Sequence, residues 1–508
     1  MLGLLSRATA NLKNSQHPAG WSPDDPAPSG FSSHKSSFSL PISSLATFSF
    51  RATGNYSQGT IVFERTEGVR RAVDPPSYGE ALHESGKPRE VGAVEVQVEA
   101  RTNSEGLYGD SRIEPVEGHE RCGLSLTTPA SSSVSRLGAT LSYHIVVAIP
   151  GTLTSLDSLV VEATGFRVVL SPSLASLPLS NLKISTTDAP ILLHNLRAED
   201  IKVRNANLLD PNKRELKNFD DLISGSVASS SRIQFECENG PISGSFRSTG
   251  ALIVHTTNFP VKGDFHGSSL RIATTNSEIS GMFDAQRDIA IQNVHGNVEG
   301  KFRAPTGCEI KGQYNAINGS FEVGNELKLI TTVFRIDATV RLLPPPSSSL
   351  STSAHPSLPV TRIASATSST NELPTFEDAM ASSASSSSFG VVNVVAETTD
   401  AAIELAYEEQ PREVALRSLA RTSGGSKVVV RHPQNWEGSF SVSTVLTHTA
   451  AFTALSTTSP TLGTRQTSFD TDSRSKVAGS VKWDRGDAGG ANNRSVVETD
   501  GPAEIVVR

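Results

Sequence analysis

A five-residue pattern, aliphatic-x-Gly-x-Phe, recurs along the middle of the chain and limits the folds open to it. Its complete copies occupy residues 242–246, 261–265, 279–283, 298–302 and 317–321. Degenerate copies at 223–227 and 336–340 extend the series, with successive steps of 19, 19, 18, 19, 19 and 19 residues. A fixed period of this length is the signature of stacked structural repeats.

Two further apolar columns keep the register of the glycine. The residues nine before it are Phe235, Val254, Ile272, Ile291, Ile310 and Leu329. Those eleven before it are Ile233, Leu252, Leu270, Ile289, Cys308 and Leu327. Apolar residues at alternate positions predict a strand with one buried face. The parity of the buried positions then changes, which requires a turn, and Asn258 and Asn276 lie there. Asn tolerates positive φ, so we expect tight corners.

Each repeat therefore predicts two strands that cannot bury their apolar faces alone. Stacking the repeats makes every apolar column continuous and pairs the backbone groups of neighbouring repeats. The Phe column is expected inside the core, and the Gly column where backbones crowd or φ is unusual. The predicted fold is all-β, a single-chain β-solenoid with coils of about 19 residues and long disordered segments.

The segments around the repeats differ from them in composition. The sequence predicts a disordered N-terminus over 1–44, a β-rich lead-in over 45–170, β-solenoid repeats over 171–342, a disordered Ser/Pro-rich insertion over 343–388, a continuation of the β-solenoid over 389–456, and a mostly polar tail with a terminal strand over 457–508. Ile403, Leu405 and Tyr407 resume the repeat register, and residues 436–440 repeat the Gly-x-Phe signature. The insertion is thus expected to interrupt one solenoid.

Charge and cysteine content exclude several function classes. The net charge of -7, from 45 basic and 52 acidic residues, provides no broad positive field for nucleic acid. Cys122, Cys237 and Cys308 have neither zinc spacing nor disulfide density, so we expect reduced core thiols. No run of 18 apolar residues predicts a membrane span. The apolar stretch at the start is short for a secretory signal, which favours an intracellular location, with a mitochondrial presequence left open.

No motif in the chain indicates an enzyme. Nucleophile-elbow, zinc-helix, phosphate-loop and Cys-x-x-Cys signatures are absent from the sequence. His255, His266 and His295 stand at different distances from the repeat glycine, so we do not expect them to share an ion. The prediction is no cofactor, no metal and no catalytic residue, with a polysaccharide lyase or hydrolase on this scaffold as a minor alternative.

One linear motif indicates a protein partner. Pro75, Pro76 and Tyr78 satisfy the Pro-Pro-x-Tyr form that WW domains bind as a polyproline II segment. The alternative is an ordinary Pro-rich loop. Protein partners are therefore expected at this segment or at the outer sheet, and no nucleic acid or membrane span is expected.

The recurrence of Thr-Thr-Asn-x-x-Ile-x-Gly-x-Phe resembles the putative-adhesin, domain-of-unknown-function β-solenoids, most of all the fungal members. The resemblance covers about residues 140–450 and implies surface binding, with no catalytic residue carried over. Two functions are expected from different classes. The first is a non-enzymatic, adhesin-like scaffold or binding protein. The alternative is a surface- or carbohydrate-binding adhesin, with a minor possibility of glycan processing.

Overall fold

The structure of the protein is a computed structural model. It describes residues 30–43, 46–66, 91–118, 121–129, 139–206, 222–344, 390–411, 413–445, 448–455, 458–459, 463–484 and 493–508. Within these ranges the regular secondary structure is almost entirely β-strand, which confirms the all-β class. The exceptions are α2 (Glu105–Gly109) and the 3-10 turn η2 (Pro172–Ser176). No helix in the described part of the chain is long and apolar enough to cross a membrane.

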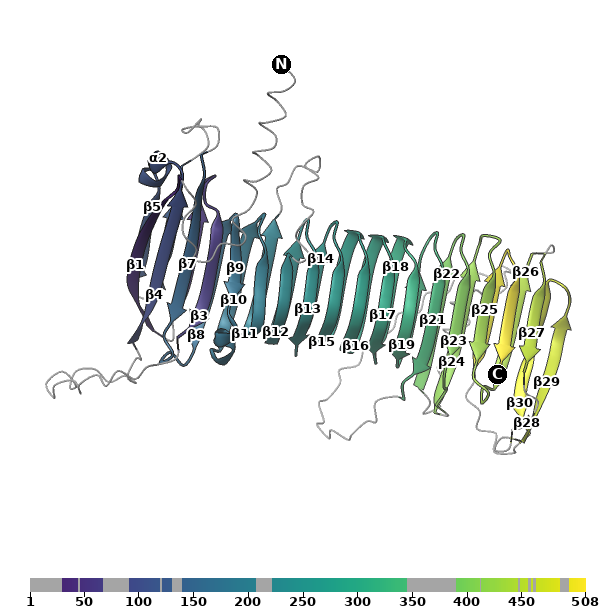
Figure 1. Ribbon diagram of the computed structural model, residues 1–508. Coiled ribbons are helices and arrows are strands. Elements are labelled where there is room, and N and C mark those ends of the chain that lie inside the picture. The colour runs from purple at the N-terminus through teal and green to yellow at the C-terminus, as the bar shows by residue number, and fades with distance from the viewer. Residues whose placement is uncertain are drawn as a thin grey trace, which may run out of the picture.

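Strands stack into two long ladders that run side by side along an elongated molecule (Figure 1). Most coils contribute one strand to each ladder. We call the ladder that holds the Gly-x-Phe strands ladder A. Along the stack it contains β1 (Ser32–Ser43), β4 (Val91–Thr102), β7 (Leu141–Ile149), β3 (Gly59–Arg65), β9 (Phe166–Leu170), the first parts of β11 (Ile191–Ala206) and β12 (Ile223–Cys237), β13 (Ile242–Ser248), the first parts of β15 (Val261–Asn276) and β16 (Ile279–His295), β17 (Val298–Ala304), β19 (Ile317–Val323), β21 (Ile336–Leu342), β23 (Ile403–Tyr407), β25 (Val428–His432), β32 (Ala503–Val507) and β27 (Ala450–Ala454).

The other ladder, ladder B, holds the strands upstream of each glycine. It contains β5 (Arg112–Gly118), β6 (Arg121–Thr127), β2 (Thr47–Thr53), β8 (Leu156–Thr164), β10 (Leu179–Thr187), the second parts of β11 and β12, β14 (Ala251–Thr256), the second parts of β15 and β16, β18 (Gly307–Tyr314), β20 (Glu326–Ile330), β22 (Gly390–Thr398), β24 (Val414–Thr422), β31 (Arg494–Thr499), β26 (Gly438–Thr444), β30 (Lys476–Trp483) and β29 (Gly463–Asp472), against which β28 (Thr458–Ser459) pairs.

The repeat columns found in the sequence are the pairing register of these ladders. Gly244 pairs with Gly263, and Phe265 pairs with Phe283, in parallel strands of consecutive coils. In ladder B, Val254 pairs with Ile272 in the same way. Every apolar residue therefore packs on its equivalent one coil away. The strand pairs predicted from the period are confirmed at the level of stacked, in-register coils.

The glycines of this column occupy positions where an added Cβ would collide with the backbone of the preceding coil. Gly244, Gly263 and Gly281 have φ of 141°, 136° and 143°, which L residues rarely adopt. A Cβ on Gly263 would lie 2.0 Å from the carbonyl oxygen of Gly244, and one on Gly281 would lie 1.9 Å from that of Gly263. Crowded backbone and unusual φ thus occur together, as the sequence predicts.

The Phe column forms a continuous aromatic core beside the glycines. Phe246, Phe265, Phe283, Phe302 and Phe321 are each 0 or 1% exposed. The ring centroids of Phe283 and Phe302 are 5.0 Å apart and their planes are within 5° of parallel. Such stacking contributes about 0.5–1.5 kcal/mol beyond the burial of the rings. The core assignment of these residues is confirmed.

Buried polar residues line the corner where each ladder B strand turns toward ladder A. They are Thr186, Asn205, Thr256, Thr274, Asn293, Thr331, Thr398, Thr422 and Thr499. Asn293 Nδ2 donates to the carbonyl oxygens of Ser277 and Gly296 at 2.9 and 2.6 Å. Because buried polar groups need partners, such bonds fix the turns. These hydrogen bonds form the tight corners that we expected from positive φ at Asn258 and Asn276. The described non-glycine residues with positive φ are Asp188 and Asn195.

At both ends of the stack, spatial order departs from chain order. The β2–β3 coil lies between the β6–β7 coil and the β8–β9 coil. The β31–β32 coil lies between the β24–β25 coil and the β26–β27 coil, so the yellow C-terminal strands stand among green ones in Figure 1. Antiparallel strands flank these coils: β4, β1 and β5 at one end, and β30 and β29 at the other.

Several sequence-based boundaries need correction at these ends. The segment 1–44, expected to be disordered, contains strand β1, which pairs antiparallel with β4 along its whole length. The segment 457–508, expected to be a mostly polar tail with a terminal strand, has that terminal strand as β32, but it also supplies β29, β30 and β31 to the stack. The Gly438-Ser-Phe440 signature belongs to β26 in ladder B, where Phe440 pairs with Ser495, and so lies outside the Phe column. Most of the insertion, 345–389, lies outside the described residues.

Candidate functional site

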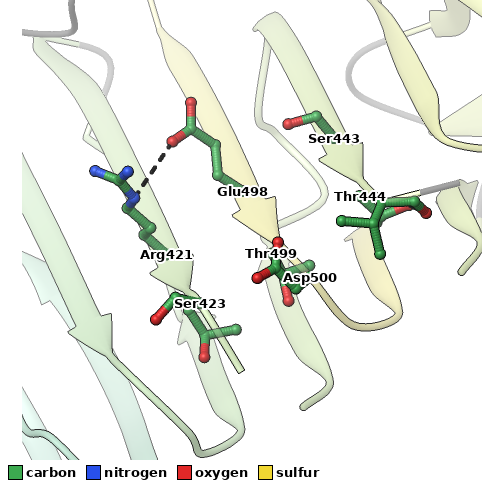
Figure 2. Close-up of a pocket in the computed structure, with 9 residues that line it drawn as sticks. Arg421, Ser423, Ser443, Thr444, Glu498, Thr499 and Asp500 are labelled. Carbon is green, nitrogen blue, oxygen red and sulfur yellow. Dashed lines mark hydrogen bonds and ion pairs between the residues drawn. The ribbon is translucent and has the colours of Figure 1, made fainter. Parts of the chain in front are cut away.

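A cleft of about 440 Å³ opens where three adjacent parallel strands of ladder B end together. The strands are β24, β31 and β26, and each supplies three residues in matching register (Figure 2). Across the cleft the rows are Arg421, Glu498 and Ser443; Thr422, Thr499 and Thr444; and Ser423, Asp500 and Val445. The cleft exists because β31 is inserted between strands that precede it in the chain.

The polar groups of the cleft are mostly engaged with one another or with the backbone. Arg421 Nε lies 3.7 Å from Glu498 Oε2, and both side chains are exposed. The Thr422 and Thr499 hydroxyls each donate at 3.2 Å to a turn carbonyl, of Thr399 and Ser426 respectively. An exposed ion pair of this kind contributes at most about 1 kcal/mol. The cleft can accept a polar ligand by hydrogen bonding, with Asp500 as a second carboxylate at its edge.

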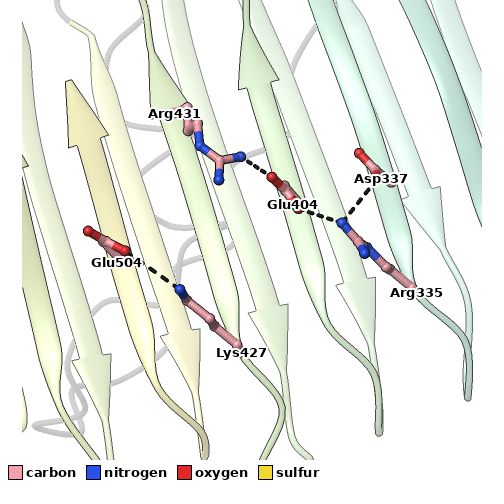
Figure 3. Close-up of polar contacts among 6 residues, drawn as sticks. All are labelled: Arg335, Asp337, Glu404, Lys427, Arg431 and Glu504. Atoms are coloured by element: carbon pink, nitrogen blue, oxygen red, sulfur yellow. Dashed lines mark hydrogen bonds and ion pairs between the residues drawn. The ribbon is translucent and has the colours of Figure 1, made fainter. Parts of the chain in front are cut away.

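The outer face of ladder A carries charges that are paired between neighbouring coils (Figure 3). Glu404 bonds to both Arg335 and Arg431, and Arg335 also lies 3.0 Å from Asp337. Lys427 and Glu504 form a further pair at 3.7 Å. The hydrogen bond from Arg431, with the charges of Arg431 and Arg335, lowers the pKa of Glu404. These groups bind adjacent coils to each other.

A buried histidine near the C-terminal end resembles half of a hydrolase site. His432 Nε2 lies 2.9 Å from Ser495 Oγ, and its ring is stacked between Tyr407 and Trp436 at centroid distances of 5.1 and 4.3 Å. Burial lowers the pKa of His432 to about 3. Ser495 and His432 are both fully buried, so a substrate in solution cannot reach them. The alternation of Val428, Val430 and His432 could have predicted this inward orientation.

The residues singled out from the sequence do not converge on one site. Pro75, Pro76 and Tyr78 lie outside the described residues. His266 lies 3.5 Å from Asp284, His295 stacks on Tyr314, and His255 is exposed in another column. No group of three metal-binding side chains gathers within the described ranges.

The three cysteines are buried and unpaired, as predicted. Burial raises the pKa of Cys122 to about 11 and that of Cys237 to about 12, and it also raises the pKa of Cys308. All three therefore remain protonated at neutral pH, and a thiol rather than a thiolate packs in the core.

The cleft residues were missed by sequence reasoning. Arg421 and Glu498 meet only because β31 is inserted beside β24, and neither stands in the 19-residue register. A signal was present in the corner sequences Thr422-Ser-Gly424 and Thr499-Asp-Gly501, which repeat one turn pattern. That similarity could have placed the two strands at equivalent positions.

Comparison with known proteins leaves the family open. No protein-family model matches the chain, and no curated protein matches it. Among solved structures it resembles one described as "a putative cell adhesion protein from Clostridium sporogenes ATCC 15579", with 8% sequence identity over 94% of this chain and 100% of that chain, and a TM-score of 0.14. The matched protein is bacterial, so the expected fungal affinity gains no support. At this TM-score the likeness supports no functional assignment.

Proposed function

We propose that this chain is a β-solenoid that acts as a non-enzymatic, adhesin-like binding scaffold. The observation that supports this role most directly is the in-register stacking of the two ladders, exemplified by the column from Gly225 to Gly319. Stacked coils place equivalent outward residues at regular intervals of about 4.8 Å. Such a frame can present an extended binding surface, as repeat proteins generally do.

The chemistry of the described polar clusters supports binding over catalysis. Glycan hydrolysis needs two carboxyl groups, one of them a general acid with a raised pKa. Glu498 and Asp500 are the carboxylates of the cleft, and Glu498 is exposed and paired with Arg421, which is no setting for a general acid. The pair of Ser495 and His432 has no access to substrate.

A cross-linked pull-down with the full-length chain tests the binding role. We expect a reproducible set of partners, and Arg421→Ala should remove those that contact the cleft. A chain that repeatedly captures nothing would contradict the proposal. Release of reducing ends from polysaccharides by the wild type, lost in Glu498→Gln, would contradict its non-enzymatic part.

The Pro75–Tyr78 segment offers a second route to a protein partner. Titration of the full chain with an isolated WW domain should show saturable binding that Tyr78→Ala abolishes. Equal binding by the variant would remove this route and leave the solenoid surface as the proposed site of contact.

The alternative role, a surface- or carbohydrate-binding adhesin, is favoured by one further surface. It is a corner of the stack that presents a row of amide side chains and exposed rings.

A further inference from the structure

Three Asn, one His and one Tyr stand in register along the corner at which ladder B turns into ladder A. Asn258 Nδ2 donates to Asn239 Oδ1 at 2.6 Å, and Asn276 Nδ2 donates to Asn258 Oδ1 at 2.8 Å. Asn276 pairs in register with His295, and His295 pairs with Tyr314. We call these five residues the corner stripe. An amide nitrogen has two N–H groups, so the Asn–Asn bonds leave Asn258 and Asn276 a second donor each.

The stripe changes from amides to rings along the stack. The rings of His295 and Tyr314 are stacked, with centroids 4.8 Å apart and planes within 14°. Tyr314 is nevertheless 48% exposed. In the next coil, the Val333 N–H donates to the Gln313 carbonyl at 3.3 Å, and Phe334, which follows, is 47% exposed. Apolar residues left exposed together indicate a contact surface, since folding alone would allow polar residues there.

The corner stripe itself includes no Asp, Glu, Lys or Arg. The turns beside it hold Glu238, Glu278 and Arg335, and each is already ion-paired: with Arg204 at 3.6 Å, with Lys262 at 3.4 Å and with Asp337 at 3.0 Å. A ligand that fits the corner stripe therefore needs no charge of its own. It offers hydroxyl or amide groups and has an apolar face.

The backbone at this corner favours a sugar polymer over a peptide strand. A peptide that binds by strand addition needs unpaired backbone groups at a sheet edge. Within the coils of the stripe, each strand is already paired on both sides, as β16 is with β15 and with β18. A ligand at this corner must therefore be recognised by side chains.

We propose that the corner stripe, with Phe334, binds a neutral glycan chain laid along the stack. The C–H faces of the sugars pack on the rings of Tyr314 and Phe334, and their hydroxyl groups bond to the amides of Asn258 and Asn276. The repeat of about 4.8 Å between coils is comparable with the length of one sugar unit, so successive sugars meet successive coils. This inference rests on the proposed binding role and names its ligand class.

Affinity electrophoresis and sedimentation of the full chain with polysaccharides test the inference. The neutral probes are soluble β-glucan, mannan, insoluble chitin and cellulose, and the charged controls are heparin and polygalacturonate. We expect at least one neutral polymer to bind, with little dependence on NaCl concentration. Tyr314→Ala and Phe334→Ala should each weaken that binding about tenfold, whereas Tyr314→Phe should retain it.

Met282→Ala is the matched control, because Met282 is 41% exposed and lies on the flat outer face away from the corner. Its glycan binding should equal that of the wild type, and all variants should keep the wild-type melting temperature within a few degrees. Equal binding by wild type and Tyr314→Ala, or binding only to the charged polymers, would overturn the assignment of the corner stripe as a site for neutral glycans. If partners were still captured in the pull-down, only this inference would fail. If neither glycan nor protein bound, the binding role would fail with it.

Discussion

The middle of the stack and its two ends are built from the same ladders but by different connections. Between β12 and β21, each coil packs on the coil that follows it in the chain. At the ends, a coil is inserted between two consecutive coils that lie far from it in sequence, as Phe48 pairs with Cys122 on one side and Leu159 on the other. In the middle, coils are added in chain order. At the ends, a distant coil is inserted between neighbours.

The difference separates local from non-local stabilisation. Contacts in the middle close short loops, so each added coil gives up little chain entropy. Contacts at the ends must first bring distant segments together, which is slower and depends on more of the structure being in place. We therefore expect the ends to respond to changes that leave the middle intact.

Removal of residues 494–508 is expected to have the largest effect. β26 and β27 would lose the coil between them and β24–β25, so hydrogen exchange in β26, β27 and β30 should approach that of an unstructured chain. Exchange in β13 to β19 should not change. Retained protection in β26 would mean that it can dock directly on β24, and the insertion would then not be essential.

Truncation of core phenylalanines should distinguish the two regions by about 1 to 3 kcal/mol. Phe283→Ala removes a ring enclosed on both sides by Phe265 and Phe302 and should cost about 3 to 5 kcal/mol. Phe440→Ala, beside the partly exposed Phe452, should cost about 2 kcal/mol because that site can collapse. Denaturant unfolding measures both, with Met282→Ala as the control. Equal losses of unfolding free energy in the two variants would contradict the expected difference between the middle and the end of the stack.

The same contrast explains how much could be predicted from the sequence. The middle was readable because Val254 meets its equivalents Phe235 and Ile272 at constant intervals. Strands β31 and β32 have no such neighbours in the chain, so no period marks them. Phe440 carried the right signature but stands in ladder B, because a local pattern does not specify which ladder a strand joins. The cleft depends on that insertion and was missed for the same reason.

Acidification should weaken the C-terminal end through His432. Folded His432 stays neutral down to about its pKa of 3, whereas the unfolded chain takes up a proton near pH 6.5. The contribution of neutral His432 to the free energy of unfolding is therefore fully present above pH 6.5. Below pH 6.5 the free energy of unfolding falls by about 1.4 kcal/mol per pH unit, which amounts to about 2.7 kcal/mol by pH 4.5. Trp436 and Trp483 fluorescence during denaturation reports this end. His432→Phe should remove the dependence, and its persistence would assign it to another group.

Loss of an outer-face ion pair is expected to have the smallest effect. Glu404→Gln weakens contacts to Arg335 and Arg431 but leaves the core unchanged, so it should cost less than about 1 kcal/mol. Because its pKa is lowered in the folded state, this contribution should be present above the ordinary carboxyl range and disappear in acid. The control is Glu299→Gln, because Glu299 stands in the same column as Glu404. If the loss of unfolding free energy in Glu404→Gln did not decrease with added NaCl, packing and not charge would account for it.

The insertion of β31–β32 also orders events during synthesis. The ribosome delivers β26 to β30 before the coil on which β26 and β27 must stack. Until residues 494–508 emerge, the partly apolar strands β26 and β27 have no parallel neighbour to cover them. The nascent chain therefore presents an open sheet edge for several seconds at ordinary elongation rates, an interval in which a chaperone could distinguish finished molecules from unfinished ones.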